Sequence, residues 1–252
     1  MRQQQSFPSL NDLAAFLESL EETIIVPLVG RGQFRHNPEV YQAGQSGFKN
    51  ETAASLFEVR LRYQEQMDAV FGRYAVPEER PYSKELPPAQ RISAEKPGLS
   101  FPLQDFNRVN LMPEIIDAYG KLVPKICRPG SDGQCGASVE YDILAVQALG
   151  RRIHFGAFYV AERKYRDDPD FYDTLIEAGD HPAILSTLRR PEVEERIISR
   201  VREKAETLQS CASPLRVRLD PEMVSAFYRD AVIPLTREGE LRYFLNRRPG
   251  GP

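Results

Sequence analysis

The sequence predicts an all-α fold, a single large domain of about ten helices built around one long central helix. Residues 138–165 contain no proline and place apolar side chains mostly at three- and four-residue steps, as a long packed helix requires. Similar helical spacing recurs along most of the chain. No stretch alternates apolar and polar residues convincingly, as a half-buried strand does. We therefore predict helices throughout, with the central helix as the element on which the others pack.

Composition limits the partners and the compartment. With 252 residues and 41% hydrophobic content, the chain can bury the core of one large domain or two small ones, and we predict one domain over 1–252. The net charge of −3 argues against nucleic-acid and polybasic-membrane partners, so any anion site must be local. Three cysteines without CxxC spacing predict neither a zinc site nor a disulfide framework and favour the cytoplasm. No apolar run is long enough to span a membrane.

Helices are also expected before the central one. The first covers 9–31, where Ser9 can cap the start and Pro27 should bend the last turn or end the helix. Others cover 52–74 and 113–126. Residues 76–102 hold six prolines, which no regular element could absorb, so we expect an irregular connection there.

Further helices are expected after the central one. Residues 168–178 and 180–188 should form short helices, and apolar residues step by four through 191–209. The last helix should begin at the cap Asp220, run towards Arg247 and kink at Pro234.

Charged side chains carry the chemistry that this fold can host. No Gly-rich nucleotide loop, metalloprotease motif or nucleophile elbow is present, and three histidines are too few for a metal cluster. His154 is expected to be a core or capping residue rather than a base. The remaining candidates are cations and carboxylates with one hydroxyl: Arg152, Arg163, Lys164, Glu194, Thr236 and Glu240. On composition alone, most such residues form solvated ion pairs, so the pattern by itself favours a surface role.

Four sequence blocks change this balance. LGRRIHFGAFYVAERKY is followed by PDFYDTLIEAGD, PEVEERIISRVREKAE and VIPLTREGELRYFLNRR. In order and spacing they resemble the fungal and plant type of chorismate mutase, and LEETIIVPLVGRGQF resembles the first helix of that family. The resemblance implies an all-helical homodimer that converts chorismate to prephenate, on the route to phenylalanine and tyrosine, without a cofactor.

The resemblance also implies roles for individual residues. Arg152 corresponds to a carboxylate-binding arginine, and Lys164 to a lysine that reaches a carboxylate and the ether oxygen of the substrate. Glu194 corresponds to the acceptor of the substrate hydroxyl, and Thr236 and Glu240 to a pair on the last helix. Glu240 would face the ether oxygen and would have to be protonated to donate there. Burial would favour that form and activity at mildly acidic pH.

Two departures from the family concern the site. Where the first helix of the family carries a second carboxylate-binding arginine, this chain has Ala14. The family also separates its arginine and lysine by 11 residues, whereas Arg152 and Lys164 are 12 apart. In an ideal helix a 12-residue step turns the side chain by about 120° away. We therefore predict a π-bulge within 156–160 that returns Lys164 to the pocket; otherwise Arg163, 11 residues on, takes its place as a substrate-binding residue.

A third departure concerns regulation. Family members that respond to aromatic amino acids bind them between subunits, through a Gly-Ser pair before the long helix and an arginine pair on an earlier helix. Here those places read Gly136-Ala137 and Gly72-Arg73, which argues against control by an aromatic amino acid effector.

More than one function remains open at this point. The favoured one is an active chorismate mutase. The alternatives are a mutase-fold protein that binds rather than catalyses, consistent with Ala14, and an isochorismate pyruvate lyase with a similar charged pocket on a related fold.

Overall fold

The computed structural model describes residues 7–91, 101–210 and 217–248. Its α-helical segments are α1 (Leu10–Ser19), α2 (Glu21–Arg31), α3 (Leu56–Val70), α4 (Met112–Ile126), α5 (Cys135–Phe155), α6 (Ala161–Asp167), α7 (Pro169–Glu177), α8 (His181–Leu188), α9 (Pro191–Ser210), α10 (Pro221–Phe227) and α11 (Ile233–Leu245). The all-α prediction is confirmed. Within the described ranges, extended backbone pairs only in two isolated bridges, Arg35 with Arg128 and Leu103 with Arg247.

The expected number of about ten helices was too high. Leu20, itself helical, joins α1 to α2, and π-helical turns join α5 to α6 and α10 to α11. The described segments therefore make up eight continuous helices, which correspond to the eight stretches that the sequence predicts one by one.

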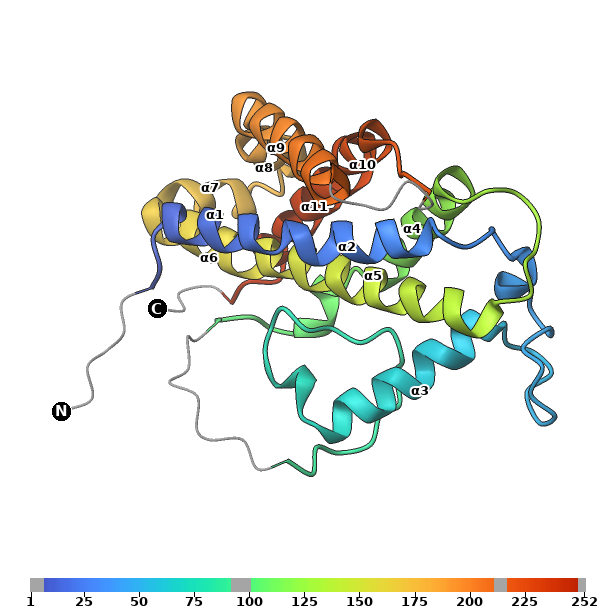
Figure 1. Ribbon diagram of the computed structural model, residues 1–252. Helices are drawn as coiled ribbons and strands as arrows, with labels where there is room; N and C mark the ends of the chain where they lie inside the picture. The colour runs from blue at the N-terminus through green and yellow to red at the C-terminus, as the bar shows by residue number, and fades with distance from the viewer. Residues whose placement is uncertain (1–6, 92–100, 211–216, 249–252) are drawn as a thin grey trace.

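The central helix is confirmed as the element around which the others are arranged. It runs from α5 through a π turn into α6 and covers residues 135–167. Its apolar side chains Ile143, Val146, Leu149 and Ile153 are buried in the main core. In Figure 1, α1 and α2 run along one side of this helix, α3 lies on another, and α9 lies beyond α1 and α2. The alignment of α1–α2 with α5–α6 forms one wall of the site described below.

Pro27 neither ends nor interrupts α2, which continues to Arg31. A proline inside a helix removes one backbone hydrogen bond. Here Ile24, Ile25 and Leu28 are fully buried on the same helix. Burial of these side chains therefore offsets the local cost, in line with the general rule that tertiary packing supplies most helix stability.

The predicted π-bulge is confirmed. Residues Gly156–Val160 form a π-helical turn, which we name the first π turn. One extra residue in an α-helix rotates everything beyond it by about 100°. A π turn absorbs such a residue, because its hydrogen bonds close over five residues instead of four. The helix beyond the turn consequently keeps Lys164 on the side that faces Arg152.

A second π turn, Tyr228–Val232, lies just before Pro234, where the sequence predicts a kink. Pro234 occupies the first turn of α11 and has no amide hydrogen to donate. The missing amide hydrogen leaves one main-chain carbonyl without its helical hydrogen bond. The π turn accommodates this break in the hydrogen-bond pattern.

Two glycines allow α11 to cross close to the first π turn. A Cβ on Gly156 would lie 2.5 Å from Thr236 Cγ2, and one on Gly239 would lie 2.6 Å from Ala157 Cβ. A side chain at either position would force these neighbouring atoms to move. The crossing brings Thr236 and Glu240 of α11 to the level of Arg152 and Lys164.

The proline-rich connection has no helix between Val76 and Arg91, and residues 92–100 of it lie outside the described part of the chain. The Glu65 carboxylate on α3 accepts hydrogen bonds from the backbone amides of Tyr82 and Ser83, at 2.6 and 2.8 Å. This buried carboxylate ties the connection to α3.

His154 is a capping residue in the core, as predicted. Its Nε2 accepts a hydrogen bond from the backbone amide of Leu111 at 2.9 Å, at the start of α4. Only a neutral imidazole can accept in this way. Burial, with the Arg80 charge as a smaller cause, lowers the pKa of His154 to about 3.

The lowered pKa predicts a dependence of stability on pH. The folded protein keeps His154 neutral, whereas the unfolded chain takes up a proton below its ordinary pKa of 6.5. Stability from this residue is therefore full above pH 6.5 and falls by about 1.4 kcal/mol per pH unit as the pH drops towards 3. We expect the parent to lose about 2 kcal/mol more than His154→Gln between pH 7 and pH 5, measured as the free energy of unfolding in urea. Equal losses in both proteins would contradict this assignment.

None of the described helices combines the length and the apolar character needed to cross a membrane.

Candidate active site

A cavity of about 600 Å³ opens between α1, the central helix, α9 and α11. Five of the six candidate residues line it: Arg152, Lys164, Glu194, Thr236 and Glu240. They come from elements that are far apart in the sequence. The packing of α1–α2 along the central helix and the glycine crossing of α11 bring them together.

Arg152 is the centre of positive charge in this cavity. Its side chain is 3% exposed, and its Nη1 lies 3.4 Å from Thr236 Oγ1, while its Nε has no partner among the described residues. No carboxylate of the described residues forms an ion pair with it. Burial lowers the pKa of Arg152, although arginine stays protonated in proteins. A buried guanidinium without a counter-ion is costly, and an anionic ligand would relieve that cost.

Lys164 and Glu240 form a buried ion pair next to Arg152. Lys164 Nζ donates to Glu240 Oε2 at 2.5 Å, and both side chains are almost inaccessible to solvent. Glu240 therefore accepts a hydrogen bond here, whereas the resemblance to the family implies that it donates one to the ether oxygen of the substrate. Because an ammonium carries three donors, Lys164 can still donate to a ligand.

Arg163 lies outside the cavity. Its guanidinium pairs with Asp167, one turn further along α6 and partly exposed. The first π turn is the reason, because it places Lys164, rather than Arg163, on the same face of the central helix as Arg152. The expected substrate-binding role of Arg163 does not fit its position.

Thr236 and Glu194 complete the polar lining. The Thr236 hydroxyl donates to the Val232 carbonyl at 2.7 Å in its own helix, so its oxygen is free to accept from Arg152. Glu194 Oε1 accepts from Arg237 Nη1 at 3.3 Å and from the backbone amide of Arg190 at 3.4 Å. Both oxygen-bearing side chains are thus held by neighbours and still face the cavity.

Ala14 lines the cavity from α1, and α1 contributes no cation to it. The structure adds charged residues that the sequence reasoning missed: Glu18, Arg190, Arg196, Arg200 and Arg237. A signal for two of them was present in the sequence. Arg237 follows Thr236 directly, and Arg190 precedes Glu194 by four residues, one helical turn.

The residues compared with the family effector site do not meet within one chain. Arg73 pairs with Asp68 and Glu79, and Glu79 also pairs with Arg151 on α5. Gly136 and Ala137 lie in the first turn of α5, exposed, about 22 Å from Arg151 at 1.5 Å per residue.

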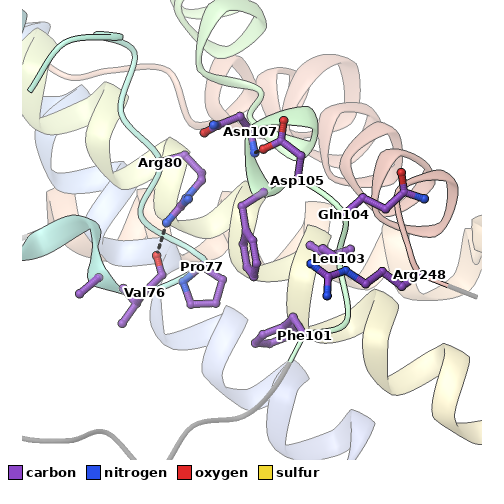
Figure 2. A pocket seen from close by; sticks show the side chains of 11 residues that line it. Val76, Pro77, Arg80, Phe101, Leu103, Gln104, Asp105, Asn107 and Arg248 are labelled. Atoms are coloured by element: carbon purple, nitrogen blue, oxygen red, sulfur yellow. Dashed lines mark hydrogen bonds between the residues drawn. The ribbon is translucent and has the colours of Figure 1, made fainter. Parts of the chain in front are cut away.

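A second cavity, of about 590 Å³, lies beside the proline-rich connection (Figure 2). Its central cation, Arg80, donates to the carbonyl oxygens of Tyr74, Val76 and Glu79. These bonds use the guanidinium within its own segment, and the Arg80–Val76 bond is visible in Figure 2. Arg80 also forms no ion pair within the described residues, but main-chain carbonyls bind its Nε and Nη2, whereas the Nε of Arg152 has no partner.

Within the described residues, no three His, Cys, Asp or Glu side chains lie close enough together to hold a metal ion. The side chains around Arg152 can instead bind an anion through guanidinium and ammonium groups, with Glu240 and Glu194 as acceptors. This combination suits a dicarboxylate that also carries a hydroxyl.

No protein-family model matches the chain. Its sequence is, however, similar to those of curated chorismate mutases. A chorismate mutase from Schizosaccharomyces pombe is 37% identical over 245 residues, which cover 94% of this chain and 96% of the relative. Chorismate mutase 2 from Arabidopsis thaliana is 34% identical over 250 residues, covering 95% and 93%.

Solved structures agree. The Aro7p chorismate mutase of Candida albicans, in complex with L-Trp, superposes with a TM-score of 0.87 at 30% identity, covering 95% of this chain and 91% of the other. The chloroplast chorismate mutase of Zea mays gives a TM-score of 0.83 at 30% identity, covering 96% of each chain. The resemblance drawn from the four sequence blocks is confirmed, and the chain belongs to the chorismate mutase family of fungi and plants.

Proposed function

We propose that this protein is a chorismate mutase that converts chorismate to prephenate in the cavity around Arg152. The observation that carries the proposal is Arg152 itself, a buried guanidinium with no carboxylate partner among the described residues. The substrate has two carboxylates, and a carboxylate that binds Arg152 replaces the missing counter-ion with a charge-assisted, bidentate contact.

The reaction requires little covalent chemistry from the protein. The ether C–O bond breaks while a C–C bond forms between the enolpyruvyl side chain and the ring, and no atom is gained or lost. Rate enhancement must come from holding the folded conformer and stabilising the charge that develops. Arg152 holds a carboxylate and thereby orients the side chain of the substrate over its ring.

Lys164 is the group placed to act on the transition state. As the ether bond lengthens, its oxygen gains negative charge, and an ammonium donating there stabilises the transition state more than the substrate. The pair with Glu240 fixes Lys164 Nζ in the cavity before substrate arrives, so little reorganisation is needed. Glu194 accepts from the substrate hydroxyl and sets the orientation of the ring.

Product identity tests the proposal. Purified protein is incubated with chorismate, and prephenate, pyruvate and salicylate are quantified over time. We expect prephenate alone. In a parallel incubation with isochorismate, formation of pyruvate with salicylate would indicate the lyase alternative. Absence of turnover by folded protein that still binds a bicyclic dicarboxylate mimic of the transition state would identify a binding protein.

We propose further that the protein is a homodimer that pairs through α3. Exposed apolar side chains gather on α3 and beside it: Phe48, Tyr63, Met67 and Phe71. Phe48 stacks on Tyr63 with ring centroids 6.3 Å apart, and Tyr63, Met67 and Phe71 follow at four-residue steps along one face of α3 and its C-cap. A contiguous apolar patch of this kind marks an interaction surface more often than a free one. In Figure 1, α3 lies across the central helix from α9 and α11, so pairing through α3 would leave the cavity open.

A charged substitution in this patch should separate the dimer. Phe71 is 64% exposed, and Phe71→Glu would bring two carboxylates into an apolar interface. We expect the parent to have twice the chain mass of 28.7 kDa by light scattering and the variant to have one chain mass. Phe171→Glu, at a 43% exposed aromatic residue on α7, is the matched control and should stay dimeric. A monomeric parent would refute the pairing.

Effector control is proposed to be weak. Solved relatives from Arabidopsis hold tyrosine or phenylalanine in an allosteric site. Here Ala137 has no hydroxyl, and the Arg73 guanidinium is already bound to Asp68 and Glu79. A cytoplasmic location also remains a proposal, supported by the free thiols of Cys127 and Cys135.

A further inference from the structure

The charges that line the cavity are unequal in number. Six cationic side chains face three carboxylates. The cations are Arg152, Lys164, Arg190, Arg196, Arg200 and Arg237. A substrate with two carboxylates is held most strongly by two cations that are not already paired with protein carboxylates, so the pairing of each cation indicates which of them can serve.

Three of the cations are committed to carboxylates. Lys164 pairs with Glu240, and Arg237 pairs with Glu194 at 3.3 Å. Arg200 binds the buried Glu21 at 2.6 Å, which is the main reason that the pKa of Arg200 is raised. Arg200 also lies 3.4 Å from Glu18. These ion pairs tie α9 to α2 and α11 and leave Arg200 and Arg237 with partners.

A fourth cation, Arg196, pairs with no carboxylate of the described residues, but its Nε donates to the Glu192 carbonyl at 3.3 Å, which holds the side chain along its own helix. Arg152 and Arg190 are the two cations of the lining whose guanidinium groups are bound neither to a carboxylate nor to a main-chain carbonyl of the described residues. Arg152 is buried, and Arg190 is exposed at the rim, directly before α9. Among the described residues, the Arg190 side chain forms no ion pair and no hydrogen bond; only its backbone amide is used, by Glu194.

The position of Arg190 is fixed by the start of α9. Its carbonyl accepts from the amides of Val193 and Glu194, both at 3.0 Å, so the residue is held by the first turn of the helix. Its charge also acts, together with that of Glu240, on the buried Tyr172 of α7. The pKa of Tyr172 is raised chiefly by burial; the Glu240 carboxylate raises it further and the Arg190 guanidinium lowers it. Arg190 and Glu240 therefore share one electrostatic neighbourhood.

We propose that Arg190 binds the second carboxylate of the substrate and so supplies the cation that is absent at Ala14. The proposal rests on the proposed mutase activity. The two arginines come from different elements. Arg152 of the central helix binds one carboxylate inside the cavity, and Arg190 binds the other at the rim. An arginine suits this position because its planar fork matches a carboxylate and its long stem can cross from α9 to the ligand.

The exposed position of Arg190 determines how its loss should appear in kinetics. A contact with a carboxylate at the rim is present in the complex with substrate as well as in the transition state. Its removal therefore weakens the binding of both by a similar amount. We expect Arg190→Ala to raise KM for chorismate by about 10- to 100-fold with kcat changed little. Arg190→Lys, which keeps the charge but not the fork, should retain much of the binding.

The matched control is Arg189→Ala, because Arg189 is the adjacent exposed arginine and does not line the cavity. Its KM should stay within about twofold of the parent, as for surface changes away from a site. Adding Ala14→Arg to Arg190→Ala returns a cation to the opposite wall and should lower KM again.

The outcomes separate this inference from the proposed function. A parent that forms prephenate, together with an Arg190→Ala variant whose KM equals that of Arg189→Ala, overturns the role of Arg190 and leaves the mutase assignment intact. A parent that forms no prephenate overturns both. A raised KM in Arg190→Ala that Ala14→Arg does not lower would show that the two positions do not address the same carboxylate, which also contradicts the proposal.

Discussion

Replacing Arg152 by methionine should reduce kcat/KM for chorismate by about 150- to 5,000-fold while leaving the protein at least as stable as the parent. The loss follows from the removal of a buried, charge-assisted anchor for a carboxylate, an interaction for which a single broken partner costs about 3 to 5 kcal/mol. Stability should respond in the opposite direction, because methionine fills the space of the arginine stem without a buried charge.

Steady-state kinetics and urea unfolding measure the two effects on one preparation. Arg151→Met is the control, since Arg151 lies beside Arg152 but points to Glu79 at a partly exposed position. We expect that variant to keep its activity within a few-fold, as for other surface ion pairs. If Arg152→Met lost stability along with activity, Arg152 would be part of the structural core instead of the binding site.

The second large effect is expected at Lys164. Lys164→Met should lower kcat by about 10²-fold or more, because it removes the donor to the developing charge on the ether oxygen, an interaction that strengthens in the transition state. It also leaves the Glu240 carboxylate buried without its ion-pair partner. We therefore expect the free energy of unfolding to fall by about 1 to 3 kcal/mol at neutral pH.

The adjacent residue provides the control. Arg163→Met removes a partly exposed pair with Asp167 and should change kcat by less than about twofold, with at most about 1 kcal/mol lost in stability. The contrast tests the first π turn directly. Larger loss in Arg163→Met than in Lys164→Met would mean that the helix in solution lacks this turn.

The sequence predicted most of the fold because helix periods, caps and prolines are local signals. The first π turn could be predicted by counting, since 12 residues separate Arg152 from Lys164 and an α-helix would turn Lys164 away. The continuation of α2 through Pro27 could not be predicted, because it depends on the burial of Ile24 and Leu28 against other helices.

The site divides in the same way. Residues that belong to recognisable blocks, such as Arg152 and Glu240, could be assigned in advance. The ion-pair partner of each charged side chain could not be predicted, because the partners come from distant helices. Glu21 on α2 pairs with Arg200 on α9, and Lys164 on α6 pairs with Glu240 on α11. The role of Arg190 could not be predicted either, because it depends on which other cations of the cavity already pair with carboxylates.

The most direct test of the account compares the affinity for a transition-state mimic with that for the substrate. A bicyclic dicarboxylate that imitates the folded transition state is titrated into the parent and into Arg152→Met by calorimetry, and KM for chorismate is measured for both. A cavity that is complementary to the transition state should bind the mimic in the parent at least about 100-fold more tightly than KM, and Arg152→Met should lose most of that advantage. Equal affinities of the parent for mimic and chorismate, or a mimic affinity that Arg152→Met leaves unchanged, would contradict electrostatic catalysis in this cavity.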